Sequence, residues 1–234
     1  ENAGIAAKRV NISVCGSDVI CRYIRLPLMQ AYELQDAIEM EWDKHITLKK
    51  DEVVWDYALL DKVTAATEKY MFVLVVAVRK AFLEERIGLL KIAGLEPGII
   101  NVDALALVNT FKFTCSGTDK HPVVILNLGE YFTNEVILRE GILLFSRDIQ
   151  IGGHDITGII AEKLHLNWPE AEELKYNPEK SKSPEISNLI KSVLDNLANE
   201  LRLSLEYFKR ELEDEISLIY IFGGSAHLYQ LDTF

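Results

Sequence analysis

The sequence has few cysteines and no dense cluster of basic residues. Its three cysteines are an odd number, and none belongs to a CxxC pair. Cys15 and Cys21 lie around a predicted turn, so a bridge is conceivable, although three reduced thiols in a reducing compartment are favoured. The net charge is −11, and the 25 Lys and Arg are dispersed. Nucleic-acid binders usually carry a basic stripe, so no nucleic-acid partner is expected.

Long hydrophobic runs are also absent. The longest apolar run, residues 71–78, is far shorter than the ~20 residues that span a bilayer, and it is typical of a buried strand. No signal peptide is visible at Glu1, and the first residue is not Met, which is expected for a processed or truncated chain. These features predict a soluble cytoplasmic protein.

Common catalytic motifs are missing as well. The five histidines are scattered without HxH or HxxxH spacing, so neither a zinc site nor any other metal site is expected. Neither GxSxG nor GxxxxGK[ST] occurs, which argues against a hydrolase nucleophile elbow and a P-loop. The chemistry must therefore be sought in weaker patterns.

The first part of the chain predicts a compact α+β unit. Residues 10–14 and 19–26 alternate in polarity around Gly16-Ser17-Asp18, which predicts a hairpin. Leu34, Ile38 and Trp42 follow helical spacing. The predicted order is β-β-α-β-β-α, with the later elements at residues 32–45, 53–60, 70–78 and 80–93.

The second part predicts a three-stranded meander followed by helices and a final strand. A short helix at residues 102–111 precedes the meander at residues 123–128, 133–138 and 141–147. The long helix expected at residues 186–213 has near-heptad leucines that favour core packing over a coiled coil. The other predicted elements are helices at 155–164 and 169–175, a charged loop at 177–184 and a buried strand at 216–222.

Three local patterns suggest a nucleotide site, and each has a simpler structural interpretation. Asn127 and Gly129 end a strand and Thr133 opens the next, so backbone N–H groups and a hydroxyl could meet a phosphate, although most such patterns are only turns. The predicted strand 216–222 ends in the small residues Gly223, Gly224, Ser225 and Ala226, where a base or ribose could lie.

The third pattern is Glu172 and Lys175, three residues apart on one helical face. A carboxylate there could accept hydrogen bonds from ribose hydroxyls, whereas the simpler interpretation is a surface ion pair. In their order along the chain, the three patterns resemble the second half of an actin-like ATPase. Within that superfamily the chain resembles the PilM family of type IV pilus assembly proteins. The resemblance runs nearly end to end, through residues 8–14, 24–29, 76–80, 94–97, 102–107, 145–153 and 170–175.

The resemblance implies an α/β fold class, with an α+β inserted subdomain and an actin-like, ribonuclease-H-like lobe. Residues 8–97 would be the inserted subdomain that PilM shares with FtsA, and residues 98–234 the second lobe. Gly129 and Thr133 would belong to the second phosphate loop, and Glu172 and Lys175 to the ribose and adenine edge. The adenosine loop would comprise Gly223, Gly224, Ser225 and Ala226.

The chain also departs from the family pattern. The opening strand and Asp-x-Gly-Ser phosphate loop are absent, and Asn127 takes the place of the usual Asp. Family members bind ATP with Mg²⁺, but Asn carries no charge to hold hydrated Mg²⁺. We therefore expect weak or absent ATP binding, and no hydrolysis because no general base is visible.

The resemblance also implies a function. Family members are cytoplasmic scaffolds, peripheral at the inner membrane, that grip the short N-terminus of the membrane protein PilN. Other proteins of the pilus alignment complex and self-association are further expected contacts. The alternatives are an active actin-like ATPase such as an FtsA-like cell-division protein, and the cytoplasmic arm of a GspL-like type II secretion protein.

Overall fold

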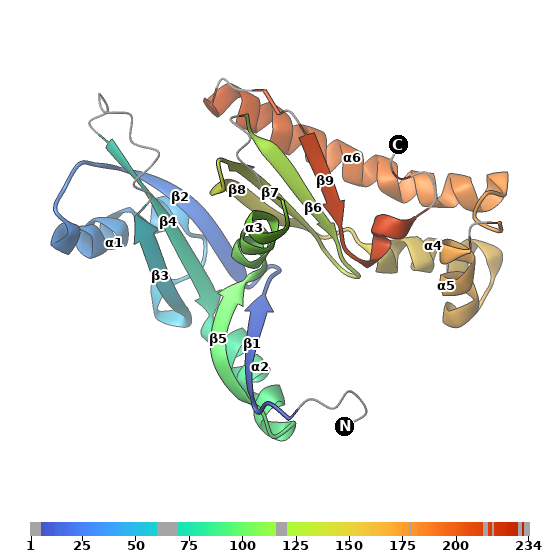
Figure 1. Cartoon of the computed structure of the whole chain (residues 1–234), viewed down its shortest axis with the longest axis horizontal. Coiled ribbons are helices and arrows are strands. Elements are labelled where there is room, and N and C mark those ends of the chain that lie inside the picture. Colours follow the sequence, from blue (N-terminus) through green and yellow to red (C-terminus); the bar gives the residue numbers. More distant parts are fainter. Residues whose placement is uncertain are drawn as a thin grey trace. The chain divides into compact units, whose positions relative to one another are not determined.

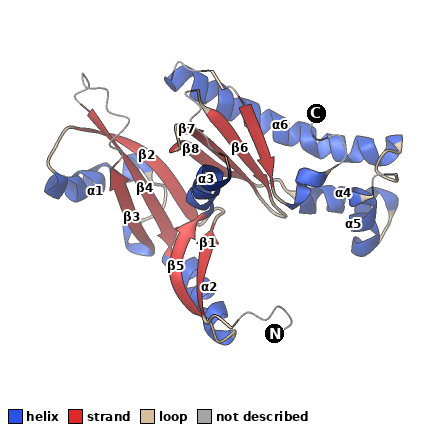
Figure 2. Ribbon diagram, viewed as in Figure 1, coloured by secondary structure: helices blue, strands red, loops and turns tan. Residues whose placement is uncertain are grey.

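The computed structural model describes residues 6–59, 70–115, 121–177, 179–212, 215–216, 218–228 and 231. The chain forms two compact units, residues 1–110 and residues 111–234, called unit 1 and unit 2 below. Figure 1 shows their elements, and Figure 2 separates helices from strands. The fold class is α/β, as predicted. The division into family domains at residues 97 and 98 remains a prediction.

Unit 1 contains a three-stranded antiparallel sheet in the order β2 (Val19–Pro27), β4 (Tyr70–Arg79), β3 (Val53–Leu59). The apolar run predicted as a central strand is therefore central. Helix α1 (Leu34–His45) covers one face of the sheet and follows the 3₁₀ turn η1 (Ala31–Glu33). Its buried residues Leu34, Ile38 and Trp42 lie four apart, and the Trp42 indole donates to the Leu48 carbonyl at 2.8 Å.

The predicted hairpin between residues 10–14 and 19–26 is wrong. Strand β1 (Arg9–Val14) pairs in parallel with β5 (Glu96–Val102), whereas β2 pairs with β4. Alternating polarity identifies strands but not their partners. Parallel partners are joined by a long connection rather than a tight turn, so the short segment after β1 gave a misleading signal.

The rest of unit 1 packs against part of the second face of the three-stranded sheet. Helix α2 (Lys80–Ile92) leads from β4 to β5 and is followed by Gly94, whose φ of +70° is the left-handed conformation expected there. Helix α3 (Asp103–Thr114) follows β5 and contains the border between the units. Buried Val14, Val78 and Val102 form a small core on this face.

Unit 2 is built on a four-stranded sheet with the order β8, β7, β6, β9. The three strands predicted as a meander are antiparallel neighbours, and β9 adds to β6 in parallel. A parallel neighbour needs a crossover, and three helices supply it. The strands are β6 (Val123–Leu128), β7 (Thr133–Arg139), β8 (Ile142–Ile149) and β9 (Leu218–Phe222).

The helices of unit 2 are α4 (Gly153–Leu164), α5 (Trp168–Tyr176) and α6 (Pro184–Leu212). The predicted core-packing role of α6 is confirmed, because its apolar stripe lies buried against α4, α5 and the sheet. Its buried apolar residues are Ile186, Ile190, Val193, Leu194, Leu197 and Phe208. No helix in the described part of the chain is long and apolar enough to cross a membrane.

One acidic residue is buried under α6. Glu135 on β7 is 0% exposed, and its carboxylate lies 3.5 Å from the Arg147 guanidinium on β8. Arg147 also pairs with Glu200 of α6 at 2.6 Å. Burial raises the pKa of Glu135 to about 7, against the lowering effect of Arg147. Cys15, Cys21 and Cys115 are not joined by disulfides.

Candidate binding sites

A polar pocket of about 240 Å³ lies within unit 2. It gathers the turn after β6, the start of α4, the helix α5 and the loop after β9. Five residues predicted for a nucleotide site line it, namely Gly129, Glu172, Lys175, Gly224 and Ser225. The structure thus brings together residues that lie up to about a hundred positions apart in the sequence.

The predicted Glu172–Lys175 pair lines this pocket. The Lys175 ammonium lies 2.9 Å from the Glu172 carboxylate and is only 2% exposed as a residue. It also donates to the Thr157 hydroxyl at 2.7 Å and to the Gly153 carbonyl at 3.1 Å. The simple surface ion pair considered from sequence is therefore wrong, because the lysine is buried and bonded to three groups.

Thr157 completes this cluster from α4. Its hydroxyl lies within hydrogen-bond reach of the Glu172 carboxylate and of the Gly153 carbonyl. Desolvation tends to raise the pKa of Glu172, but the bonds from Thr157 and Lys175 outweigh it and hold the pKa below its usual range. Glu172 therefore stays ionised at neutral pH and ties α5 to α4.

The backbone N–H groups at the start of α4 are hydrogen-bonded to other groups of the protein. The backbone N–H of Gly152 donates to the Asp155 carboxylate at 2.8 Å. The N–H of Gly153 donates to the Gly129 carbonyl at 2.9 Å, and that of His154 to the Glu130 carbonyl at 2.8 Å. A helix N-terminus binds phosphate through such groups when they are free. Here all three are used within unit 2.

The other predicted site residues do not line this pocket. The Asn127 amide donates to Asn134 at 2.8 Å, and the Thr133 hydroxyl donates to the Ile151 carbonyl at 2.7 Å. Gly223 has a φ of +95°, and a Cβ on it would lie 2.4 Å from the Leu128 carbonyl. Glycine is thus required there for the loop itself. Ala226 closes the same loop through its N–H to the Gly223 carbonyl.

Sequence reasoning missed several residues of the pocket. Trp168 lies in the pocket wall, where the centre of its ring is 4.4 Å from that of His154. His154 directly follows the Gly152-Gly153 pair, and this position beside two glycines is the feature of the sequence that could have identified it as a pocket residue. Thr157, which bonds to Glu172 and Lys175 but does not line the pocket, gave no signal in the sequence, since a threonine within an apolar helical stretch is unremarkable. The pocket residues not predicted are Glu130, Gly153, His154, Trp168 and Tyr176.

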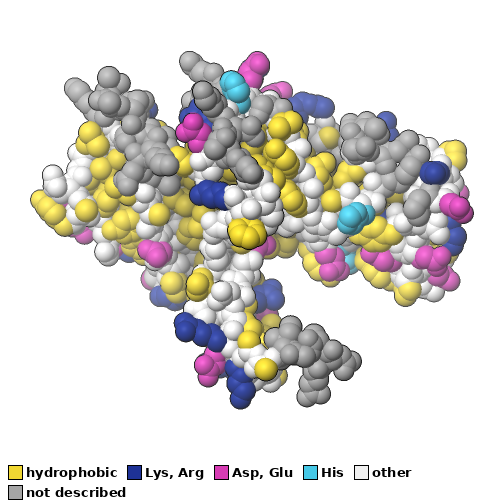
Figure 3. Space-filling model, viewed as in Figure 1, with side chains coloured by type: hydrophobic (Ala, Val, Ile, Leu, Met, Phe, Trp, Pro, Cys, Tyr) yellow, Lys and Arg dark blue, Asp and Glu magenta, His cyan; other side chains and the backbone are white. Residues whose placement is uncertain are grey.

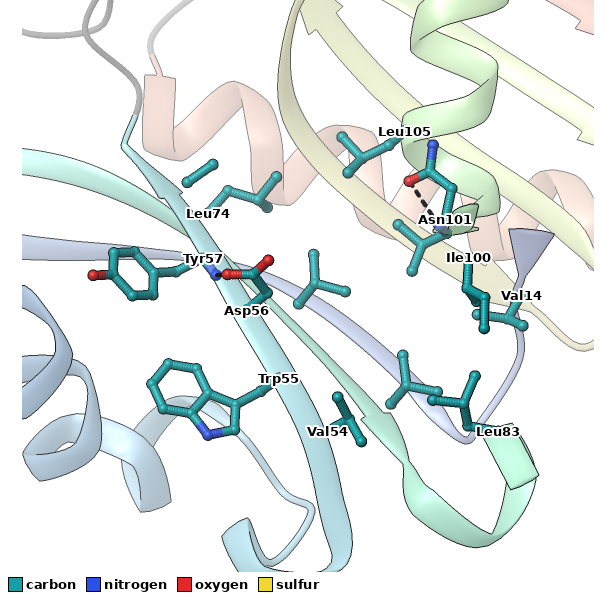
Figure 4. A pocket seen from close by; sticks show the side chains of 14 residues that line it. Val14, Val54, Trp55, Asp56, Tyr57, Leu74, Leu83, Ile100, Asn101 and Leu105 are labelled. Carbon is teal, nitrogen blue, oxygen red and sulfur yellow. Dashed lines mark hydrogen bonds between the residues drawn. The ribbon is translucent and has the colours of Figure 1, made fainter. Parts of the chain in front are cut away.

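A larger pocket, of about 450 Å³, lies within unit 1. It is on the face of the three-stranded sheet opposite α1. Figure 4 shows that Val54 and Asp56 point to this side of β3, whereas Trp55 and Tyr57 point to the other. Its lining is mostly aliphatic and includes Val14, Val54, Ala58, Leu74, Val76, Val78, Leu83, Ile100, Val102 and Leu105.

Apolar surface stays open to solvent beside this pocket. Val54, which faces the pocket from the edge strand β3, is 50% exposed. Hydrophobic side chains also gather at the surface over the sheet of unit 1 in Figure 3. Such surface usually marks a contact with another molecule. Among the described residues, no cluster of three or more His, Cys, Asp or Glu could hold a metal ion.

The fold is actin-like. Similar solved structures include MreB5 of Spiroplasma citri bound to AMPPNP, with 18% identity over 67% of this chain and 56% of that one, at a TM-score of 0.51. The ADP-bound form of the same protein matches at 16% identity and the same TM-score, over 67% and 57%. The chain belongs to the family of the type IV pilus assembly protein PilM, whose model matches residues 1–234.

A solved PilM-PilN type IV pilus biogenesis complex gives a much stronger structural match. The identity is 27% and the TM-score is 0.84, and the match covers 98% of this chain. The chain spans 66% of the length of the matched protein. The predicted family is therefore confirmed.

Proposed function

We propose that the chain is a scaffold of type IV pilus biogenesis whose unit 1 pocket binds the cytoplasmic N-terminal segment of a PilN-type inner-membrane protein. The observation that carries the proposal is the open aliphatic pocket beside an edge strand, in a chain that matches a PilM-PilN complex. Such binding would hold the protein at the cytoplasmic face of the inner membrane, near other pilus alignment proteins.

The physical argument rests on the pocket's lining. A short segment that is extended in solution loses conformational entropy when it binds, so it needs buried apolar area to compensate. Val76 and Leu105 are partly exposed and offer such area, and Val54 and Ala58 continue it to the open edge of β3. Among described residues β3 pairs only with β4, so its outer edge can also receive an extended segment.

The unit 2 pocket fits ATP with Mg²⁺ poorly. Its volume of about 240 Å³ is below the usual range of ligand pockets. The donors of the α4 start and of Lys175 are used internally, and Asn127 cannot supply charge for a metal. We infer that this chain binds ATP weakly and does not hydrolyse it. Calorimetric titration showing micromolar Mg-ATP affinity, or steady phosphate release, would favour the actin-like ATPase alternative.

Calorimetric titration with a synthetic peptide tests the scaffold proposal. The peptide has the cytoplasmic N-terminal sequence of the PilN-type protein. Ala58 is exposed in the pocket, so Ala58→Trp fills the pocket without disturbing the core, and it should weaken binding at least about tenfold. The matched control is Ala31→Trp, an exposed position outside the pocket. Equal affinities for both variants would place the peptide elsewhere.

A further inference from the structure

The apolar pocket of unit 1 contains one carboxylate. Asp56 lies on β3 between Val54 and Ala58 in the alternation that faces the pocket, and its side chain points into it (Figure 4). Asn101, on β5, is the other polar side chain of the lining. An acidic side chain at this place adds nothing to an aliphatic contact, so it needs a separate explanation.

The contacts of these two residues leave hydrogen-bonding capacity for a ligand. Asp56 accepts one hydrogen bond, from the adjacent Tyr57 N–H at 2.8 Å, and the residue is exposed. The Asn101 side-chain oxygen accepts from the Val102 N–H at 2.9 Å, an orientation that turns its NH₂ group away from that bond. A carboxylate accepts several hydrogen bonds, so Asp56 can bind a cationic donor while keeping the bond from Tyr57.

We propose that Asp56 determines the specificity of the pocket by pairing with a Lys or Arg side chain of the bound segment, whose neighbouring aliphatic residues fill the rest. This inference rests on the proposed function. Cytoplasmic segments next to a membrane span carry an excess of Lys and Arg, which makes a basic side chain available there. The chain's net charge of −11 also attracts such a segment.

A purely structural role for Asp56 makes a different prediction. Charged side chains on edge strands prevent unwanted strand pairing, and the bond that the Tyr57 N–H donates to Asp56 occupies a backbone donor of β3. In Asp56→Asn the amide oxygen can still accept that bond, but the charge is lost. A structural role would therefore leave peptide affinity unchanged in this variant, whereas an ion pair would not.

The test is calorimetric titration of the chain with the synthetic PilN-type peptide, and with peptides in which each Lys or Arg is replaced in turn by Gln. Asp56→Asn should weaken binding about tenfold and reduce its dependence on salt. One peptide replacement should have the same effect on the wild type and little effect on Asp56→Asn, as a double-mutant cycle requires. Asp43→Asn, an equal charge change at an exposed position of α1, is the matched control.

The possible failures are distinguishable. If the wild type binds the peptide but Asp56→Asn binds equally well with the same salt dependence and no coupled position, the inference about Asp56 is overturned and the proposed function stands. An equal loss in Asp43→Asn would also overturn it, because the effect would then be general electrostatics. If the wild type does not bind the peptide at all, the proposed function fails, and the inference fails with it.

Discussion

The two pockets differ in how far their polar groups are already hydrogen-bonded within the protein. In unit 2, Lys175, Glu172 and Thr157 bind one another, and the N–H groups at the start of α4 are bound by neighbouring backbone. In unit 1, a mostly aliphatic wall surrounds an exposed Asp56. Buried polar groups need hydrogen-bond partners. When the protein itself supplies those partners, the bonds hold the shape of the pocket but leave little hydrogen-bonding capacity for a ligand. This difference favours our proposal that unit 1, rather than unit 2, binds the PilN-type segment.

The largest effect on the free energy of unfolding is expected from Lys175→Met, which removes the central donor of the unit 2 network. Methionine keeps much of the volume but removes the ammonium that donates to Glu172, the Gly153 carbonyl and Thr157. The free energy of unfolding should fall by about 3 kcal/mol, because the three bonds of the buried ammonium are lost together. Urea denaturation followed by tryptophan fluorescence measures it. Lys163→Met, at an exposed lysine of α4, should cost less than about 0.5 kcal/mol. Equal stability of the two variants would show that the network does not hold unit 2 together.

The next effect concerns the buried acid Glu135, the counterpart of exposed Asp56. Its folded pKa of about 7 lies above the ordinary value of 4.5, so its stabilising contribution is complete below about pH 4.5 and is lost as pH rises through about 7. Over that range the wild type should lose about 2–3 kcal/mol relative to Glu135→Gln. Urea denaturation at pH 4.5, 6, 7 and 8 measures the difference. Glu206→Gln, at an exposed site on α6, should show no such change. A constant difference across this range would contradict burial of an ionising carboxyl.

A smaller effect is expected from Thr157→Val, which keeps the shape but removes the hydroxyl shared by Glu172, Lys175 and Gly153. The cost should be about 2 kcal/mol, because charged partners lose a buried hydrogen bond. Thr133→Val loses one bond, to the Ile151 carbonyl, and should cost about 1 kcal/mol. Thermal and urea unfolding compare the two variants. The reverse order would mean that Thr157 is not part of the network.

The smallest effect on stability is expected from Asp56→Asn. The side chain is exposed and its amide oxygen can still accept from Tyr57, so the free energy of unfolding should change by less than about 0.5 kcal/mol. Any effect on peptide affinity would then belong to recognition alone. A loss of more than about 1 kcal/mol would instead show that Asp56 serves the fold, and the contrast between the two pockets would be weaker.

Much of the local structure follows from the sequence. The four-residue spacing of Leu34, Ile38 and Trp42 predicts α1, and the apolar run at residues 71–78 predicts the central strand β4. These predictions succeed because a helix or strand that buries one face carries its period in the sequence. The partner of β1 could not be predicted this way, since β5 lies about eighty residues further along and leaves no periodic trace in β1.

The sequence by itself determined most helices and strands and the family. It also identified Glu172, Lys175 and the glycine-rich loop as candidate residues of a nucleotide site. Only the tertiary structure decided that Lys175 is buried and fully bonded, that the start of α4 is closed, and that Asp56 lies in an aliphatic pocket. The physical reason is that the residue type determines only which bonds a side chain can make. Whether those bonds are made within the fold or left for a partner depends on which distant segments the fold brings beside it.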